Sequence, residues 1–168
     1  SSAITHKINN LTMDSTPTTQ LAYPIHHFDG EGSLHVFGDQ DASHLVIMCA
    51  GFPDGQQVFS PLAKRLATTE GCLVGVTCFH GYDGGVTSYP KNGYSFADIT
   101  VYLREVVKAL RSHSTKNVDE TQLTAVFHDW GVLPGFTYTN EVIDEKLKDL
   151  TPDQLVIFDS LLDIHPKK

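Results

Sequence analysis

The sequence predicts a three-layer α/β fold with a mostly parallel sheet, and three observations support it. Short continuous apolar runs recur along the chain, amphipathic stretches with helical spacing stand between them, and Gly- or Pro-rich segments bound them. Apolar runs too short for helices are typical of strands that are buried on both faces. Strands that alternate with helices form parallel sheets covered by helices.

The composition is that of one compact domain. The 168 residues are 40% hydrophobic and 19% charged, with 12 Lys and Arg against 20 Asp and Glu and a formal net charge of −8. This apolar content can build a core, and the low charge content is not typical of disordered chains. The acidity argues against nucleic acid and anionic lipid as partners, and no apolar run is long enough for insertion into a membrane.

The N-terminal part of the chain divides into an arm and the beginning of a core. Residues 1–20 are rich in Ser, Thr and Asn without periodicity, and we interpret them as an N-terminal arm before a core domain over residues 21–168. Two strand-like runs, Tyr23–Phe28 and Leu34–Phe37, flank a turn signal at residues 29–32. This pattern predicts an opening hairpin.

Strands and helices are then predicted in alternation. The further strand runs are Leu45–Cys49, Cys72–Cys78, Leu123–Phe127 and Leu155–Phe158. Ser60 is predicted to cap a helix with Pro61 in its first turn, and Ser95 to cap a longer helix in a capping box with Asp98. The apolar face predicted for this longer helix comprises Phe96, Ile99, Leu103, Val106, Val107 and Leu110. Ligands of such sheets bind beyond the carboxyl ends of the strands.

The cysteines and histidines do not predict a metal site. Cys49, Cys72 and Cys78 lack metal-type spacing, and two of them lie in apolar runs, as buried free thiols do. We therefore expect a soluble protein of a reducing compartment, the cytoplasm or an organelle matrix. The pair His26-His27 would face opposite sides of a strand, and Gly81–Gly85 lacks the Lys-Ser/Thr of a phosphate loop. No metal or cofactor is expected.

Two strand ends carry residues suited to nucleophilic catalysis. Ala50-Gly51-Phe52-Pro53-Asp54 follows one buried run, and His128-Asp129-Trp130-Gly131 follows another. A carboxylate on a sharp strand-to-helix turn can attack an electrophilic carbon and form an ester. Backbone N–H groups of Phe52 and Trp130 would stabilise the oxyanion when water hydrolyses that ester. The alternative role for Asp129 is that of a helix N-cap.

With these motifs the chain resembles the first half of an α/β-hydrolase-fold enzyme of the epoxide hydrolase and haloalkane dehalogenase kind. The segment 128–131 is similar to that group's nucleophile elbow, and Gly51-Phe52-Pro53 to its oxyanion motif. Gly81-Tyr82-Asp83-Gly84, followed by Ser88-Tyr89-Pro90, resembles the loop after the next strand. The resemblance extends from about Tyr23 to His165.

The resemblance implies a catalytic mechanism and a substrate class. It makes Asp129 the nucleophile and the N–H groups of Phe52 and Trp130 the oxyanion hole. It also implies a pocket lined by Phe52, Pro53, His128 and Trp130. Phe52 stands where dehalogenases often carry a halide-binding Asn, so the resemblance favours a small apolar epoxide as substrate. A serine esterase is disfavoured because the elbow presents Asp129.

The chain also departs from the family pattern. Phe127 stands in place of a small residue before the elbow, Ala50 in place of a histidine, and Pro134 with Gly135 is expected to interrupt the following helix and distort the elbow. The family's lid, base histidine and orienting acid follow the strand that corresponds to residues 155–158. His165 follows that strand too closely to be this base, so no base is assigned.

Two functions therefore stay open. In the first, the chain is the N-terminal part of an α/β-hydrolase core, without the lid and the last strands, and hydrolyses an epoxide when the remainder is supplied elsewhere. In the second, it is a catalytically inactive relative that serves as a structural or interaction subunit. For either function, the family's sheet continues past the strand at residues 155–158, so this strand would be an open sheet edge, which predicts a protein partner or self-association there.

Overall fold

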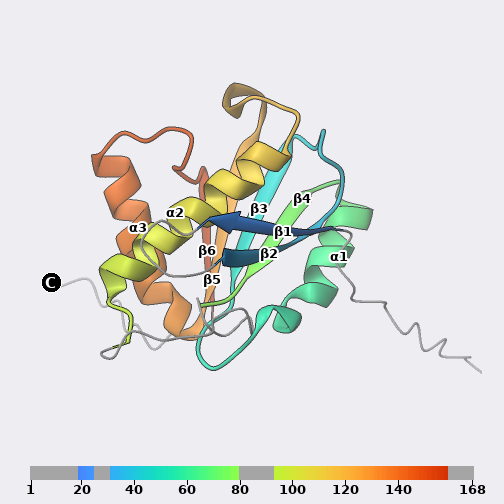
Figure 1. The fold of residues 1–168 in the computed structure, drawn as a ribbon. Coiled ribbons are helices and arrows are strands. Elements are labelled where there is room, and N and C mark those ends of the chain that lie inside the picture. The colour runs from blue at the N-terminus through green and yellow to red at the C-terminus, as the bar shows by residue number, and fades with distance from the viewer. Residues whose placement is uncertain (1–18, 25–30, 80–92, 159–168) are drawn as a thin grey trace, which may run out of the picture.

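The computed structural model describes residues 19–24, 31–79 and 93–158, and Figure 1 shows their arrangement. The elements are β1 (Thr19–Pro24), β2 (Glu31–Phe37), β3 (His44–Cys49), η1 (Gln56–Val58), α1 (Ser60–Thr69), β4 (Leu73–Thr77), α2 (Phe96–His113), η2 (Val118–Glu120), β5 (Gln122–His128), η3 (Asp129–Gly131), α3 (Val132–Asp144) and β6 (Gln154–Phe158). The interpretations of residues 1–18, of the pair His26-His27, of the glycine-rich segment 80–92 and of His165 concern positions outside these ranges.

The strands form one sheet in the order β1-β2-β4-β3-β5-β6. β3 pairs in parallel with both β4 and β5, and β5 pairs in parallel with β6. β2 runs antiparallel to β1 and to β4. The predicted hairpin and the mostly parallel sheet are therefore confirmed, although the first strand lies earlier than expected, at Thr19–Pro24.

Helices cover both faces of the central strands, so the fold has three layers (Figure 1). Because successive side chains of a strand point to opposite faces, the strands contribute to two separate cores. On one face α2 and α3 pack on a core that includes Leu45, Ile47, Leu103, Val107, Leu123, Ala125 and Val142. On the other face α1 packs on a core that includes Val46, Met48, Phe59, Ala63, Val74, Val76 and Val126.

β6 is the outermost described strand on its side of the sheet. Leu155 and Ile157 pack against the core beneath α2 and α3. Val156 and Phe158, which point to the other face, are 42% and 39% exposed. The α1 face of this strand is therefore only partly covered by the described residues.

The first turn of α2 forms as predicted. The Ser95 side chain accepts a hydrogen bond from the Asp98 backbone N–H (3.2 Å), and the Asp98 carboxylate accepts one from the Ser95 N–H (2.8 Å). The buried face differs from the prediction, because it begins only at Thr100 and leaves Phe96 53% exposed. Tyr102 is buried instead, since its hydroxyl finds a partner in the Thr77 hydroxyl at 2.6 Å.

The predicted role of Ser60 as an N-cap is wrong. Phe59 is the N-cap of α1, and Ser60 is already its first helical residue. The reason is that η1 runs directly into α1, so that the Ser60 hydroxyl donates to the Gln56 carbonyl oxygen at 3.4 Å. Pro61 lies in the first turn, as predicted, where its missing N–H costs nothing.

The predicted interruption of the helix at Pro134 and Gly135 is also wrong. α3 runs without a break from Val132 to Asp144. Because α3 begins at Val132, Pro134 falls in the first turn, where backbone N–H groups have no partner within the helix. The proline therefore removes a hydrogen bond that the helix would not have made.

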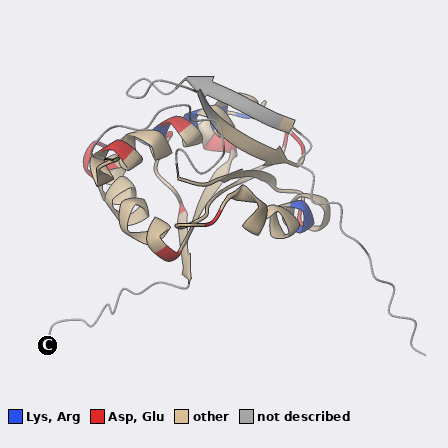
Figure 2. Ribbon diagram, turned by 60° about the horizontal axis from the view of Figure 1, so that its bottom comes forward, with Lys and Arg blue, Asp and Glu red and all other residues tan. Residues whose placement is uncertain are grey.

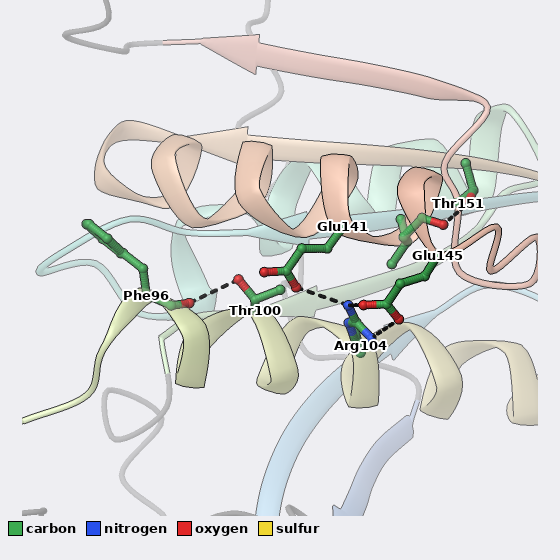
Figure 3. Close-up of polar contacts among 7 residues, drawn as sticks. Phe96, Thr100, Arg104, Glu141, Glu145 and Thr151 are labelled. Atoms are coloured by element: carbon green, nitrogen blue, oxygen red, sulfur yellow. Dashed lines mark hydrogen bonds and ion pairs between the residues drawn. The ribbon is translucent and has the colours of Figure 1, made fainter.

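An ion-pair cluster joins α2 to α3. Figure 3 shows Arg104 of α2 reaching toward Glu141 and Glu145. Its two terminal nitrogens donate to the Glu145 carboxylate at 2.8 and 2.7 Å, and one of them donates to Glu141 at 3.0 Å. The hydrogen bonds from Arg104 lower the pKa of Glu145. Figure 2 shows acidic segments on these two helices and a basic turn on α1, which contains Lys64 and Arg65.

Candidate functional site

The parallel register brings the two predicted motifs to one edge of the sheet. Cys49, the last residue of β3, lies opposite Thr77 of β4 and Phe127 of β5. His128 of β5 lies opposite Phe158 of β6. The segments that follow β3 and β5 therefore leave the sheet side by side, at the carboxyl ends where ligands of such folds bind.

Asp129 occupies a sharp turn between β5 and α3. Its φ angle is +52°, in the left-handed region that non-glycine residues rarely adopt. Its side chain caps neither of the following helices, because the N-cap of η3 is His128 and that of α3 is Gly131. The capping alternative for Asp129 is therefore not what the structure shows.

The turn brings Asp129 against the loop that follows β3. A Cβ atom placed on Gly51 would lie 2.7 Å from the Asp129 Cβ, 2.7 Å from the His128 carbonyl oxygen and 2.8 Å from the Asp129 Oδ2. Contacts this short leave no space for a side chain at position 51. The glycine is thus required by the close approach of the Asp129 carboxylate to the backbone that precedes Phe52.

The loop from Ala50 to Asp54 is itself closed by backbone hydrogen bonds. The Ala50 N–H donates to the Thr77 carbonyl oxygen at 3.1 Å, and the Asp54 N–H donates to the Gly51 carbonyl oxygen at 2.8 Å. Phe52 and Pro53 form the tip of this turn, are joined by a cis peptide bond and are both exposed. The turn therefore presents the Phe52 backbone beside the elbow.

Two exposed aromatic side chains flank the elbow. Phe52, in the neighbouring loop, is 48% exposed, and Trp130, which directly follows Asp129, is 49% exposed. The Asp129 side chain itself is half-buried. Aromatic side chains this exposed offer apolar area to a ligand that approaches the carboxylate. Of the four residues predicted to line a pocket, Phe52, Pro53 and Trp130 are exposed at this edge.

The fourth residue, His128, points to the α1 face of the sheet. Its ring lies edge-on to Phe59 with a centroid distance of 5.9 Å, and its centroid lies 5.4 Å from that of Phe158. Its Nδ1 is 3.9 Å from the Asp54 Oδ2. This imidazole–carboxylate contact had no predicted role, although Asp54 directly follows the Gly-Phe-Pro motif.

The bulky residue before the elbow is accommodated by a glycine on α3. A Cβ atom on Gly135 would lie 2.4 Å from the Cγ and Cδ2 atoms of the Phe127 ring. Phe127 is 1% exposed and belongs to the core beneath α2 and α3. Gly135 therefore provides the space that the bulky Phe127 ring occupies, and the two positions are complementary.

The thiols near this edge are not suited to act as nucleophiles. Cys49 is fully buried, and its burial together with the nearby Cys78 raises the pKa of its thiol. A buried thiol stays protonated and inert.

Among the residues that the structure describes, no group of three His, Cys, Asp or Glu side chains is placed to hold a metal ion. No helix in those same ranges is long and apolar enough to cross a membrane.

Comparison with solved structures identifies the fold. The chain is similar to the haloalkane dehalogenase DpaA from Paraglaciecola agarilytica (TM-score 0.67, 14% identity, 93% of this chain and 48% of that one). It is similar to an epoxide hydrolase of the α/β-hydrolase superfamily from metagenomes of hot environments (TM-score 0.65, 14% identity, 84% of this chain and 42% of that one). It is also similar to the haloalkane dehalogenase DatA from Agrobacterium tumefaciens (TM-score 0.62, 16% identity, 86% of this chain and 42% of that one).

These similarities cover most of this chain but less than half of each structure. The chain therefore has the architecture of the N-terminal part of those proteins, as the residue motifs suggested. No family model matches the sequence, and no curated protein matches it.

Proposed function

We propose that this chain, which has the fold of the α/β hydrolases, carries the nucleophilic half of an epoxide-hydrolysing site with Asp129 as the nucleophile. The left-handed turn at Asp129, with its carboxylate against Gly51, is the observation that carries the proposal. Such a turn holds the carboxylate out from the end of the sheet, where a substrate can reach it. An aspartate fixed in this way supports ester chemistry.

In the first step, a carboxylate oxygen of Asp129 attacks one carbon of the epoxide ring. A new C–O ester bond forms, the ring C–O bond breaks, and its electron pair remains on the ring oxygen, which takes a proton from water. The exposed side chains of Phe52 and Trp130 provide the apolar surface for the carbons of the substrate. Binding the reacting carbon beside a fixed nucleophile converts a bimolecular attack into an intramolecular one.

In the second step, water attacks the ester carbonyl carbon of Asp129 and releases a diol. The carbonyl oxygen carries negative charge in the intermediate, and we assign its stabilisation to the backbone N–H groups of Phe52 and Trp130. The loss of one such donor typically slows a reaction by about 10²–10³. We propose that the base that activates the water is supplied from outside the described residues, since this chain spans 42–48% of the structures named above.

A small apolar epoxide is the substrate class that the site residues favour. Phe52 provides an aromatic ring, not an amide that could bind halide, next to Gly51. Phe52, Pro53 and Trp130 are apolar and exposed at this edge of the sheet. Incubation with styrene oxide and measurement of the intact mass tests the proposal: an adduct that the Asp129→Asn variant does not form supports it, and equal labelling of the two proteins contradicts it.

A second candidate function is supported by the partly exposed β6. Val156 and Phe158 are apolar and 42% and 39% exposed on the outermost described strand. An edge strand presents unpaired backbone N–H and C=O groups with which another chain can pair. We propose as the alternative that the chain is an inactive relative that binds a protein partner or a second copy through β6.

The two candidates differ in a measurement of mass in solution. If β6 is an interface, the chain sediments as a complex or dimer, and Val156→Lys returns it to a monomer without changing its circular dichroism. A monomer at all concentrations, together with an Asp129 adduct, supports the nucleophile and removes the support for the interface.

A further inference from the structure

Asp54 and His128 form a contact that the proposed chemistry does not use. The His128 Nδ1 lies 3.9 Å from the Asp54 Oδ2, and the two side chains are 16% and 39% exposed. The distance is longer than a direct hydrogen bond, so the contact is a close approach of the imidazole ring to the carboxyl group. Its place in the chain is informative, because each partner is next to a proposed functional residue.

Both ends of the loop turn contact the elbow. The Asp54 N–H donates to the Gly51 carbonyl oxygen at 2.8 Å, which makes Gly51 and Asp54 the two ends of a turn with Phe52 at its tip. Gly51 packs against Asp129, and Asp54 reaches His128. Consecutive elbow residues are thus contacted by the two ends of the turn.

His128 is a fixed point for this contact. Its ring is packed against Phe59 and Phe158, which also pack edge-on against each other at 5.8 Å. Phe52, in contrast, is 48% exposed. The turn that carries the Phe52 backbone is thus contacted at both of its ends by the elbow.

We propose that Asp54 and His128 are positioning residues: a clamp that holds the Phe52 N–H in place for the oxyanion of the Asp129 ester. This inference rests on the proposed function of Asp129. The clamp touches neither the substrate nor the ester, and acts only through the loop. It predicts an effect on the breakdown of the ester and little effect on its formation, since the oxyanion arises only when the ester carbonyl is attacked.

The test therefore measures ester breakdown alone. The 168-residue chain is alkylated with styrene oxide, freed of reagent and treated with hydroxylamine. Hydroxylamine attacks the ester carbonyl carbon, a C–N bond forms, and the bond between that carbon and the ester oxygen breaks while the nitrogen loses a proton. The released alkoxide takes a proton to give the diol, and Asp129 remains as a hydroxamate. The loss of adduct mass with time gives the rate.

We expect Asp54→Asn to slow this step by about 10-fold, less than the loss of a whole oxyanion donor. Asp54→Glu restores most of the rate, and His128→Gln slows it as Asp54→Asn does. If Asp54 acted only through its charge, Asp54→Asn would speed ester breakdown, because it removes a negative charge near the forming oxyanion. Asp144→Asn, on the exposed end of α3, serves as the control and leaves the rate unchanged.

Amide hydrogen exchange of residues 50–58 provides a readout that needs no adduct. The clamp predicts faster exchange in Asp54→Asn than in the unchanged chain or in Asp54→Glu. If an Asp129 adduct forms but the rates of ester breakdown and of amide exchange are the same in all variants, the proposed clamp is wrong. The assignment of Asp129 as the nucleophile is then unaffected. If no adduct forms, the proposed function fails, and hydrogen exchange alone decides whether the contact holds the loop.

Discussion

Gly51 and Asp129 lie in such close contact that a Cβ atom on the glycine would approach the aspartate Cβ to 2.7 Å and its Oδ2 to 2.8 Å. The two residues are far apart in sequence and belong to the segments after β3 and β5, which the parallel register places side by side. This contact joins the proposed oxyanion loop to the proposed nucleophile. Every prediction about the site depends on it.

Gly51→Ala tests this contact. The new methyl group overlaps the Asp129 side chain and the His128 backbone, and overpacking of this kind costs about 1–3 kcal/mol. We expect a lower urea midpoint and a loss of Asp129 labelling by styrene oxide. Gly55→Ala is the matched control, because the three atoms nearest to its Cβ belong to the exposed Gln57 side chain, which can move away. Equal stability of the two variants would contradict the contact.

Phe127 and Gly135 provide a second test, by a double-mutant cycle. Gly135→Ala places a methyl group in the Phe127 ring and is expected to destabilise by about 1–3 kcal/mol. Phe127→Ala empties a buried position and is expected to cost about 3–5 kcal/mol. Because the methyl group can occupy the emptied space, the double variant is expected to be more stable than the sum of the single effects allows. Strict additivity of the unfolding free energies would show that the residues do not share this space.

The Arg104 cluster predicts a pH dependence of stability. Arg104 lowers the pKa of Glu145 below its ordinary value of 4.5. The carboxylate therefore stabilises the folded state above that value, and the contribution is lost as the pH falls through the lowered pKa. Glu145→Gln is expected to reduce the urea midpoint at pH 7, and the deficit is expected to shrink below pH 4.5. Asp144→Asn is the control. A deficit that is independent of pH contradicts the assignment.

The cysteines predict the reactivity of the folded chain. Cys49, Cys72 and Cys78 are buried, and burial raises the pKa of Cys49 and of Cys72. We expect a charged disulfide reagent to modify none of the three thiols in the native chain and all three in denaturant. Rapid modification of a native thiol would contradict the packing of β3 and β4.

The strands β3 to β6 were predictable from the sequence because each one contains a short apolar run between breakers, whereas β1 lies earlier than its predicted run. α2 was predictable because Ser95 and Asp98 form a local capping box, which depends only on residues three apart. Features that depend on residues that are distant in sequence but adjacent in space were not predictable. Tyr102 is buried because Thr77 of another element accepts or donates its hydrogen bond, and no local pattern indicates such a partner.

The surroundings of the elbow also depend on contacts that no local sequence pattern indicates. Phe127 and Pro134 looked unfavourable in sequence, because one is bulky and the other breaks helices. The structure resolves both: Gly135 makes space for the Phe127 ring, and the start of α3 at Val132 puts Pro134 in the first turn. The position of Asp129 was predictable from its motif, whereas its contact with Gly51 required the register of β3 and β5.

The most direct measurement of the central claim is the position of the styrene oxide adduct in the chain. We predict that peptide fragmentation places a single adduct between His128 and Trp130, on Asp129, and that Asp129→Asn, which tolerates the same left-handed turn, carries none. An adduct spread over exposed carboxylates such as Asp144 and Glu145, or one that persists in Asp129→Asn, would contradict the assignment of Asp129 as a nucleophile.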